Sequence, residues 1–151
     1  MSTSNANLLI QPYLFFGGRC EEALEFYRTA VGAEVQMMMR YKDNPERDSE
    51  RAIAPCFHDK VMHATFQIGG STLMASDGMC EGTPNFDGFS LSINVPDEAE
   101  AERVYNALVH DGGLATMPLE KTFWAPKFGM LTDRFGVGWM ISVAHKPTPD
   151  Q

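Results

Sequence analysis

His63 is the residue of this sequence whose type and position best suit chemistry. It lies in the segment HATFQI, where apolar and polar residues alternate as they do in a half-buried strand. A histidine can act there as a general base or as a polar anchor for a ligand, because imidazole changes its charge near neutral pH. It can equally be a structural residue hydrogen-bonded to Ser76. No carboxylate is evident to orient it, so the catalytic residues stay unknown, with His63 as the best candidate.

The other reactive residue types show no catalytic spacing. Cys20, Cys56 and Cys80 form no CxxC pair, and none is spaced so that a histidine falls beside it. The odd number of cysteines argues against a disulfide framework and for a reducing compartment. The sequence has no Ser-His-Asp arrangement and no P-loop, and Gly17-Gly18 lacks the rest of a glycine-rich nucleoside-binding fingerprint.

Hydrophobic periodicity predicts the elements that position these residues. In chain order they are a strand at 8–16, a helix at 21–31, a strand at 34–41, two strands within 62–76 joined by Gly69-Gly70, a strand at 89–95, a helix at 97–109, and strands at 114–119, 129–132 and 138–143. The order strand, helix, three strands occurs twice, and a shift of 78 positions superposes Ala23 on Ala101 and Tyr27 on Tyr105. We therefore predict an α+β fold of two βαβββ modules; the alternative is a chance likeness of two helices in one α+β domain.

Composition limits the partners. The net charge of −8 disfavours nucleic acid and anionic membranes, which require clustered lysines and arginines. Residues 40–51 contain several basic residues but also four acidic ones, so we predict a solvated loop. Neither a signal peptide nor a membrane-spanning apolar run is visible, and we expect a soluble cytoplasmic protein.

Strand periodicity also sorts the side chains by face. One face of each module is apolar and should pack on the helix. The opposite face carries Ser, Thr, Gln, Met and one His, a mixture typical of the wall of an amphipathic pocket, although an antiparallel sheet can also turn such a face to water. The residues predicted to line a cavity are Gln11, Tyr13, His63, Thr65, Met74, Ser76, Ser90, Ser92, Trp124, Phe128 and Met140.

Several segments together resemble the PhnB-like branch of the vicinal-oxygen-chelate superfamily, which contains glyoxalase I, bleomycin-resistance proteins and extradiol dioxygenases. These segments are PYLFFGG, EALEFY, HATFQIGGSTLMASD and TFWAPKFGMLTDRFGVGWMI. The resemblance covers about residues 8–145. It implies one domain over residues 1–151, with modules at about 8–80 and 86–145, a curved mixed sheet around a cavity, and a homodimer whose cavities involve both chains.

The resemblance also implies four metal-ligand positions, one on the first and one on the last strand of each module. They fall on Gln11, Met74, Ser90 and Met140 in this sequence. Divalent cations of this superfamily need imidazole and carboxylate donors, and thioethers are poor ligands for Zn²⁺, Ni²⁺ or Mn²⁺. We therefore predict no metal and no cofactor.

Three functions stay open on the sequence, so whether the chain is an enzyme is uncertain. The first is a metal-free binding protein for an unknown small organic ligand. The second is a metal-dependent lyase, isomerase or dioxygenase with a relocated ligand set that includes His63. The third is the methyltransferase named in the label of this branch, 3-demethylubiquinone methyltransferase. Fold alone does not choose among them.

Overall fold

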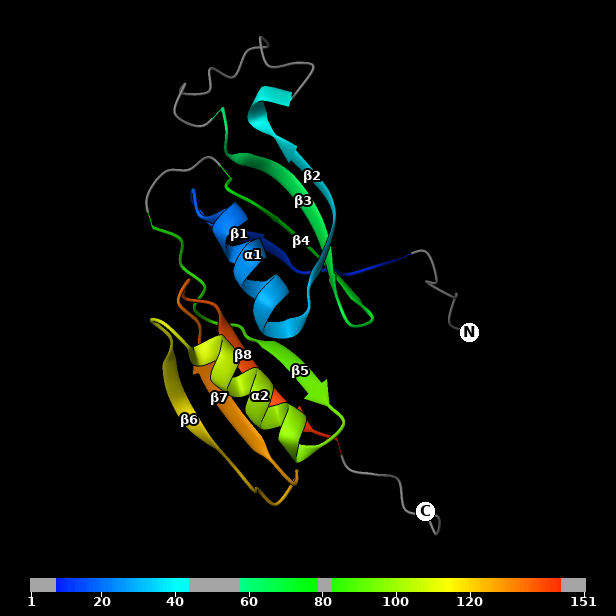
Figure 1. Ribbon diagram of the computed structural model, residues 1–151, viewed down its shortest axis with the longest axis vertical. Helices are drawn as coiled ribbons and strands as arrows, with labels where there is room; N and C mark the ends of the chain where they lie inside the picture. Colours follow the sequence, from blue (N-terminus) through cyan, green and yellow to red (C-terminus); the bar gives the residue numbers. More distant parts are fainter. Residues whose placement is uncertain (1–7, 44–57, 79–82, 145–151) are drawn as a thin grey trace. The chain divides into compact units, whose positions relative to one another are not determined.

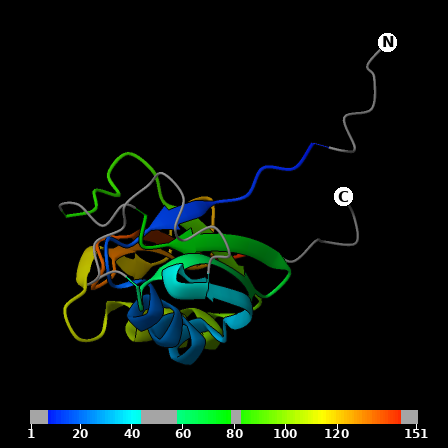
Figure 2. The same cartoon turned by 90° about the horizontal axis from the view of Figure 1, so that it is seen from above.

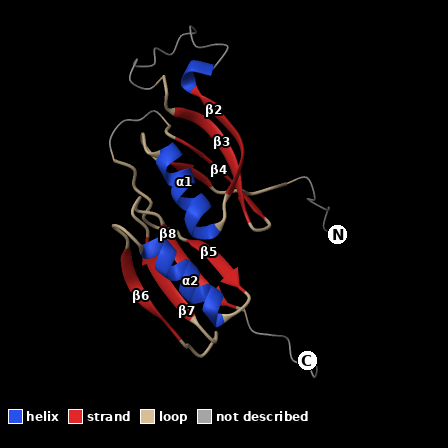
Figure 3. Cartoon of the chain, in the orientation of Figure 1, coloured by secondary structure: helices blue, strands red, loops and turns tan. Residues whose placement is uncertain are grey.

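A computed structural model describes residues 8–43, 58–78 and 83–144 of the 151-residue chain. The chain forms two compact units, and the main boundary between them lies between residues 82 and 83. Each unit holds one helix and one four-stranded mixed sheet (Figures 1 and 3). The loop predicted at residues 40–51 lies largely outside the described residues. No helix in the described part of the chain is long and apolar enough to span a membrane.

The first module has the predicted order strand, helix, three strands. Its elements are β1 (Tyr13–Phe15), α1 (Cys20–Val31), β2 (Glu34–Arg40), the 3-10 turn η1 (Tyr41–Asp43), β3 (Val61–Ile68) and β4 (Ser71–Ser76). The sheet order is β1-β4-β3-β2, in which β1 runs parallel to β4 and the other pairs are antiparallel. Gly69, at a φ of 57°, makes the predicted hairpin turn, and Ile68 pairs with Ser71 as expected.

The second module repeats this topology. Its elements are β5 (Leu91–Val95), α2 (Glu98–Val109), β6 (Leu114–Glu120), β7 (Phe128–Thr132) and β8 (Gly138–Val143). The sheet order is β5-β8-β7-β6, and β5 runs parallel to β8. The predicted pair of βαβββ modules is confirmed.

Each helix covers one face of its own sheet through the side chains that the repeat superposes (Figures 1 and 2). Tyr27 of α1 is buried and stacks on Phe66 of β3, with ring centroids 6.5 Å apart. Tyr105 of α2 is also buried, and its hydroxyl donates to the carbonyl oxygens of Met117 and Met130 at 2.8 and 3.1 Å. The helix-facing side of each sheet is therefore the hydrophobic core of its module.

The two helices begin differently. The Asp97 side chain accepts a hydrogen bond from the Glu100 amide at 2.8 Å and caps α2 in the usual way. In α1 the N-cap is Arg19, which makes no side-chain capping bond. The amides of Gly18 and Cys20 instead donate to Oδ1 of Asp77, at 2.7 and 2.8 Å, and Asp77 follows the last strand of the module. The start of α1 is thus tied to the end of β4.

Candidate functional site

The face of the first sheet opposite α1, here called distal face 1, holds five of the eleven predicted cavity residues: Tyr13, His63, Thr65, Met74 and Ser76. Cα pairing aligns Tyr13 with Met74, Met74 with Thr65, and Thr65 with Met37, in one row across β1, β4, β3 and β2. His63 lies in the next row, opposite Met39. The remaining members of the face are Phe15, Glu34, Gln67, Thr72 and Ser76.

Tyr13, His63 and Thr65 form a hydrogen-bonded triad on this face. The Tyr13 hydroxyl lies 3.1 Å from Nδ1 of His63, and the Thr65 hydroxyl lies 3.3 Å from Nε2 of the same ring. The rings of Tyr13 and His63 have centroids 5.6 Å apart, and Phe15 lies 4.8 Å beyond Tyr13. All three members of the triad are half-buried, so they are held in place yet reachable from the face.

The alternative in which His63 is hydrogen-bonded to Ser76 is not what the structure shows. Ser76 is buried, and its hydroxyl oxygen accepts a bond from the Gly78 amide at 3.1 Å. The imidazole is oriented by two hydroxyl groups instead, one of them fifty residues away along the chain. Ser76 therefore belongs to the scaffold that ends β4.

Sequence reasoning missed three contributions to distal face 1. Met37 and Met39 add thioethers beside the triad, and alternation within β2 would have placed them there. Asp77 supports the face from behind, since its Oδ2 also accepts from the Val61 amide at 2.8 Å and so fixes the start of β3, two residues before His63. An aspartate between a strand and a glycine has the pattern of a turn residue, so no sequence signal identified it as a buried anchor.

The second sheet has a corresponding face, here called distal face 2, on the side opposite α2. Met140 lies between Ser92 on β5 and Met130 on β7, as Met74 lies between Tyr13 and Thr65. Met117 of β6 pairs with Met130 as Met37 pairs with Thr65. Each module therefore presents methionines at equivalent points.

Phe128 is the residue of the second module that corresponds to His63. Phe128 pairs with Ser142 of β8, and His63 lies at the equivalent point of β3, beside Ser76 of β4 if the printed pairing is continued by one residue. Phe128 is buried, and Trp124 contacts it edge-on with centroids 5.3 Å apart. Phe123 extends this cluster and is 94% exposed. Distal face 2 is consequently apolar and aromatic where distal face 1 carries its polar triad.

The four metal-ligand positions that the resemblance implies carry neither an imidazole nor a carboxylate. Gln11 lies two residues before Tyr13, and it is Tyr13 that pairs with Met74; Ser90 likewise lies two residues before Ser92, which pairs with Met140. Each module thus offers one thioether and one neutral oxygen, which is not the imidazole and carboxylate set that such ions require. Among residues 8–43, 58–78 and 83–144, no three His, Cys, Asp or Glu side chains are grouped to hold a metal.

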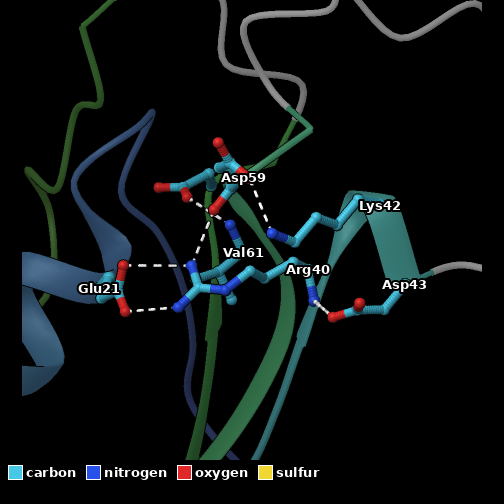
Figure 4. A network of polar contacts seen from close by, with 7 residues as sticks. Glu21, Arg40, Lys42, Asp43, Asp59 and Val61 are labelled. Carbon is cyan, nitrogen blue, oxygen red and sulfur yellow. Dashed lines mark hydrogen bonds and ion pairs between the residues drawn. The ribbon is translucent and has the colours of Figure 1, made fainter.

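A polar cleft of about 400 Å³ lies at the end of the first module, where α1 begins and β2 ends. Figure 4 shows the network of polar contacts there. Arg40 donates to both carboxylate oxygens of Glu21, at 2.6 and 3.1 Å, and to the Asp59 carbonyl at 2.8 Å. Lys42 pairs with the Asp59 carboxylate at 3.0 Å, and Lys60 donates to the Gly18 carbonyl at 2.9 Å. The hydrogen bond from Arg40 lowers the pKa of Glu21.

The cleft contains Arg40, which is the last residue of β2 and lies within the strand predicted at 34–41. The three cations of the cleft, Arg40, Lys42 and Lys60, each have a protein partner, so the network joins α1, β2 and the residues just before β3. We assign it a structural role.

Cys20 is fully buried; burial raises the pKa of its thiol, and the nearby Asp77 raises it further, so we expect it to be a poor nucleophile. Cys56 and Cys80 lie outside the described residues.

Comparison with known proteins gives consistent matches over nearly the whole chain. The family model described as 3-demethylubiquinone-9 3-methyltransferase matches residues 9–142. Protein YjdN of Escherichia coli K12 is 35% identical over 148 residues, covering 94% of this chain and 99% of YjdN.

Solved structures agree. PA1353 from Pseudomonas aeruginosa is 44% identical with a TM-score of 0.79, over 92% of this chain and 99% of PA1353. The PhnB protein from Bacillus cereus is 29% identical with a TM-score of 0.73, over 91% of this chain and 100% of PhnB. A glyoxylase/bleomycin resistance protein/dioxygenase domain from Frankia, 15% identical with a TM-score of 0.60, covers 95% of this chain and 100% of that domain, and shares the fold alone.

Proposed function

The chain belongs to the PhnB-like family described as 3-demethylubiquinone-9 3-methyltransferase, within the glyoxalase/bleomycin-resistance/dioxygenase superfamily, and from this premise we propose that it binds a small organic molecule on distal face 1 without a metal ion. The observation that carries the proposal is the Tyr13–His63–Thr65 triad, a polar anchor set among thioethers and aromatic rings. Such a mixture suits a ligand with an apolar body and a small number of polar atoms.

The chemistry of the four ancestral ligand positions supports the metal-free form of this proposal. Gln11 and Met74 in the first module, and Ser90 and Met140 in the second, offer no anionic donor. A relocated metal site at His63 is not favoured either, because both ring nitrogens already engage hydroxyl groups. The methyltransferase alternative has no support from a nucleoside-binding loop. We also propose that the protein is a homodimer in the cytoplasm. Light scattering of the purified protein tests the dimer, because the measured mass can be compared with the chain mass of 16.8 kDa.

Thermal-shift screening of the purified protein tests the proposed function. A library of small organic compounds should contain ligands that raise the melting temperature. At about one hundred times the Kd, a ligand adds about 2.7 kcal/mol of stability. His63→Ala should abolish the shift. The matched control is His110→Ala, which removes an exposed histidine that ends α2 and should retain the shift.

Metals and the methyl donor form the opposing arms. Ni²⁺, Zn²⁺, Mn²⁺ and Fe²⁺ should leave the melting temperature unchanged, and calorimetry with S-adenosylmethionine should show no heat of binding. A stoichiometric transition metal in the purified protein that is lost in His63→Ala would favour the metalloenzyme instead.

A further inference from the structure

Three methionines lie side by side on distal face 2. Met117 of β6 is the Cα partner of Met130 of β7, and Met130 is the Cα partner of Met140 of β8. Directly opposite residues of paired strands project from the same face of the sheet, with Cβ atoms about 4.5–5.5 Å apart. The three thioethers therefore form one continuous row across three neighbouring strands, here called the methionine row.

The corresponding row of distal face 1 is interrupted. There Thr65 pairs with both Met37 and Met74, so that it separates the two methionines. Met37 and Met74 are thus two strand spacings apart, about 9.6 Å, whereas neighbours in the methionine row are one spacing apart, about 4.8 Å. The second module brings its thioethers together where the first module keeps them apart.

The backbone beneath the methionine row is held by Tyr105 of α2. Its hydroxyl lies 2.8 Å from the carbonyl oxygen of Met117 and 3.1 Å from that of Met130. Gly129 gives the ring its room, because a Cβ there would lie 2.8 Å from the Tyr105 ring. The ladder of β6 shifts register on both sides of Met117, yet the pair with Met130 is kept. The two residues are therefore placed by specific contacts as well as by regular strand pairing.

The three side chains are able to converge on one atom. All of them are half-buried, so their stems are packed while the row stays open to the face. A methionine is unbranched and has three rotatable bonds, so Met117 and Met140 can each lean across one strand spacing toward a point above Met130. Strands favour β-branched and aromatic residues, so strand propensity does not explain three methionines in this row.

The chemistry of the donors decides which ion such a row would hold. A thioether is a soft, uncharged ligand, and soft sulfur ligands select Cu(I), whereas imidazole and carboxylate serve the divalent cations considered above. The replacement of a hard donor by Met140 therefore disfavours Zn²⁺, Ni²⁺ and Mn²⁺ but favours a soft monovalent ion. The net charge of −8 also raises the concentration of cations around the chain.

We propose that the methionine row of distal face 2 is a binding site for Cu(I), which the thioethers of Met117, Met130 and Met140 hold. The site does not depend on the organic ligand proposed for distal face 1. It also differs from the four positions that the resemblance implies, since Met117 and Met130 are not among them. The ion binds as Cu(I), and no electron is transferred.

Competition with bathocuproine disulfonate under anaerobic conditions measures the affinity of the full-length chain for Cu(I). The background carries Cys56→Ser and Cys80→Ser, because thiolates also bind this ion. Cys20 is fully buried and is kept. We expect a single Cu(I) per chain, and an excess of Zn²⁺ should not displace it. A background protein that takes no Cu(I) from the competitor would overturn the proposal.

Substitution by leucine removes each sulfur with little change in side-chain volume. Met117→Leu, Met130→Leu and Met140→Leu should each weaken Cu(I) binding by about tenfold or more, since loss even of a group that supports a metal ligand costs that much. Met38→Leu is the matched control, because Met38 is also a half-buried strand methionine but pairs with Ala64. It should keep the affinity. Equal affinities in all four variants would refute the assignment.

Isotopic labelling of the methionine methyl groups gives a second readout that needs no substitution in the titrated protein. Cu(I) is diamagnetic, so NMR can follow each methyl signal as the ion is added. The three signals of the methionine row should shift together, and His63→Ala should leave these shifts intact, which separates this site from a metal bound at His63. Shifts confined to Met37, Met39 and Met74 would place the ion on distal face 1 and overturn the proposal.

Discussion

Replacing Asp77 by asparagine perturbs the anchor behind distal face 1 with no change in side-chain size. Asp77 is 2% exposed, and its two carboxylate oxygens accept three backbone hydrogen bonds. Oδ1 receives the amides of Gly18 and Cys20, at 2.7 and 2.8 Å, and Oδ2 receives the Val61 amide at 2.8 Å. An asparagine has one carbonyl oxygen and one NH₂ group, so one side of this arrangement must set a donor against a donor.

The least costly arrangement keeps the oxygen toward Gly18 and Cys20. The two bonds there then change from charged to neutral acceptors and weaken by about 0.5–1 kcal/mol each. The buried Val61 amide loses its side-chain acceptor, which costs about 1–3 kcal/mol. The expected loss in free energy of unfolding is therefore about 2–5 kcal/mol, a large share of the stability of an ordinary domain.

Chemical denaturation of the purified protein, followed by circular dichroism, measures this loss. A value near 3 kcal/mol corresponds to a fall in Tm of about 6–12 °C for a chain of this size. Asp87→Asn is the matched control at an exposed site and should change stability by less than about 0.5 kcal/mol. If Asp77→Asn and Asp87→Asn unfold at the same denaturant concentration, the three hydrogen bonds do not anchor the module as described.

Three further outcomes are expected. The hydrogen bond from Arg40 lowers the pKa of Glu21, so in Arg40→Gln this pKa should return to the ordinary carboxyl range in an NMR titration. In the wild type the ion pair stabilises the fold at pH values above that range, and this stabilisation is lost as the pH falls through the lowered pKa. An unchanged midpoint would contradict the ion pair. Iodoacetamide at about pH 8 should leave Cys20 unmodified in the folded protein and alkylate it in urea, as peptide mass spectrometry would show, because burial raises its pKa; rapid labelling of the native protein would speak against that burial. Gly113→Ala should lower the free energy of unfolding by about 1–3 kcal/mol, because the added Cβ would lie 2.5 Å from a backbone oxygen of α2. Gly70→Ala is the control, since its Cβ would meet no atom within 4 Å and the stability should be nearly unchanged. Identical denaturation midpoints for the two variants would refute the steric reasoning.

The fold could be predicted because local pattern and global repeat agree. Alternation set the bounds of β8 at Gly138–Val143, as the structure has them, and Gly32, at a φ of 72°, ends α1 in the left-handed conformation that favours glycine. The first strand was predicted too long. Pro12 has no N–H to donate to a sheet, and the ladder begins only at Tyr13.

The site was predicted by face and not by contact. Period two placed Tyr13, His63, Thr65 and Met74 on one side of the sheet, since that follows from backbone geometry. Which groups hydrogen-bond depends on rotamers and on pairs far apart in sequence, so the sequence suggested Ser76 as the partner of the histidine, and the structure shows Tyr13 and Thr65. The same limit applies to Arg40, whose acidic neighbours in sequence are not its main partners in space.

The three-residue length of β1 bears on the order in which distal face 1 assembles. β1 pairs with β4 across about 60 residues of chain, whereas the β3–β4 hairpin closes through a two-residue turn, so the hairpin can form early and β1 can dock on it late. A short edge strand also detaches at a lower free energy than the whole module unfolds. Tyr13 would leave with it while His63 and Thr65 stay on β3. Transient fraying of one peripheral strand would thus dismantle the triad without melting the fold, and amide exchange at Phe16, whose N–H donates to the Ser76 carbonyl at 2.8 Å, would report it.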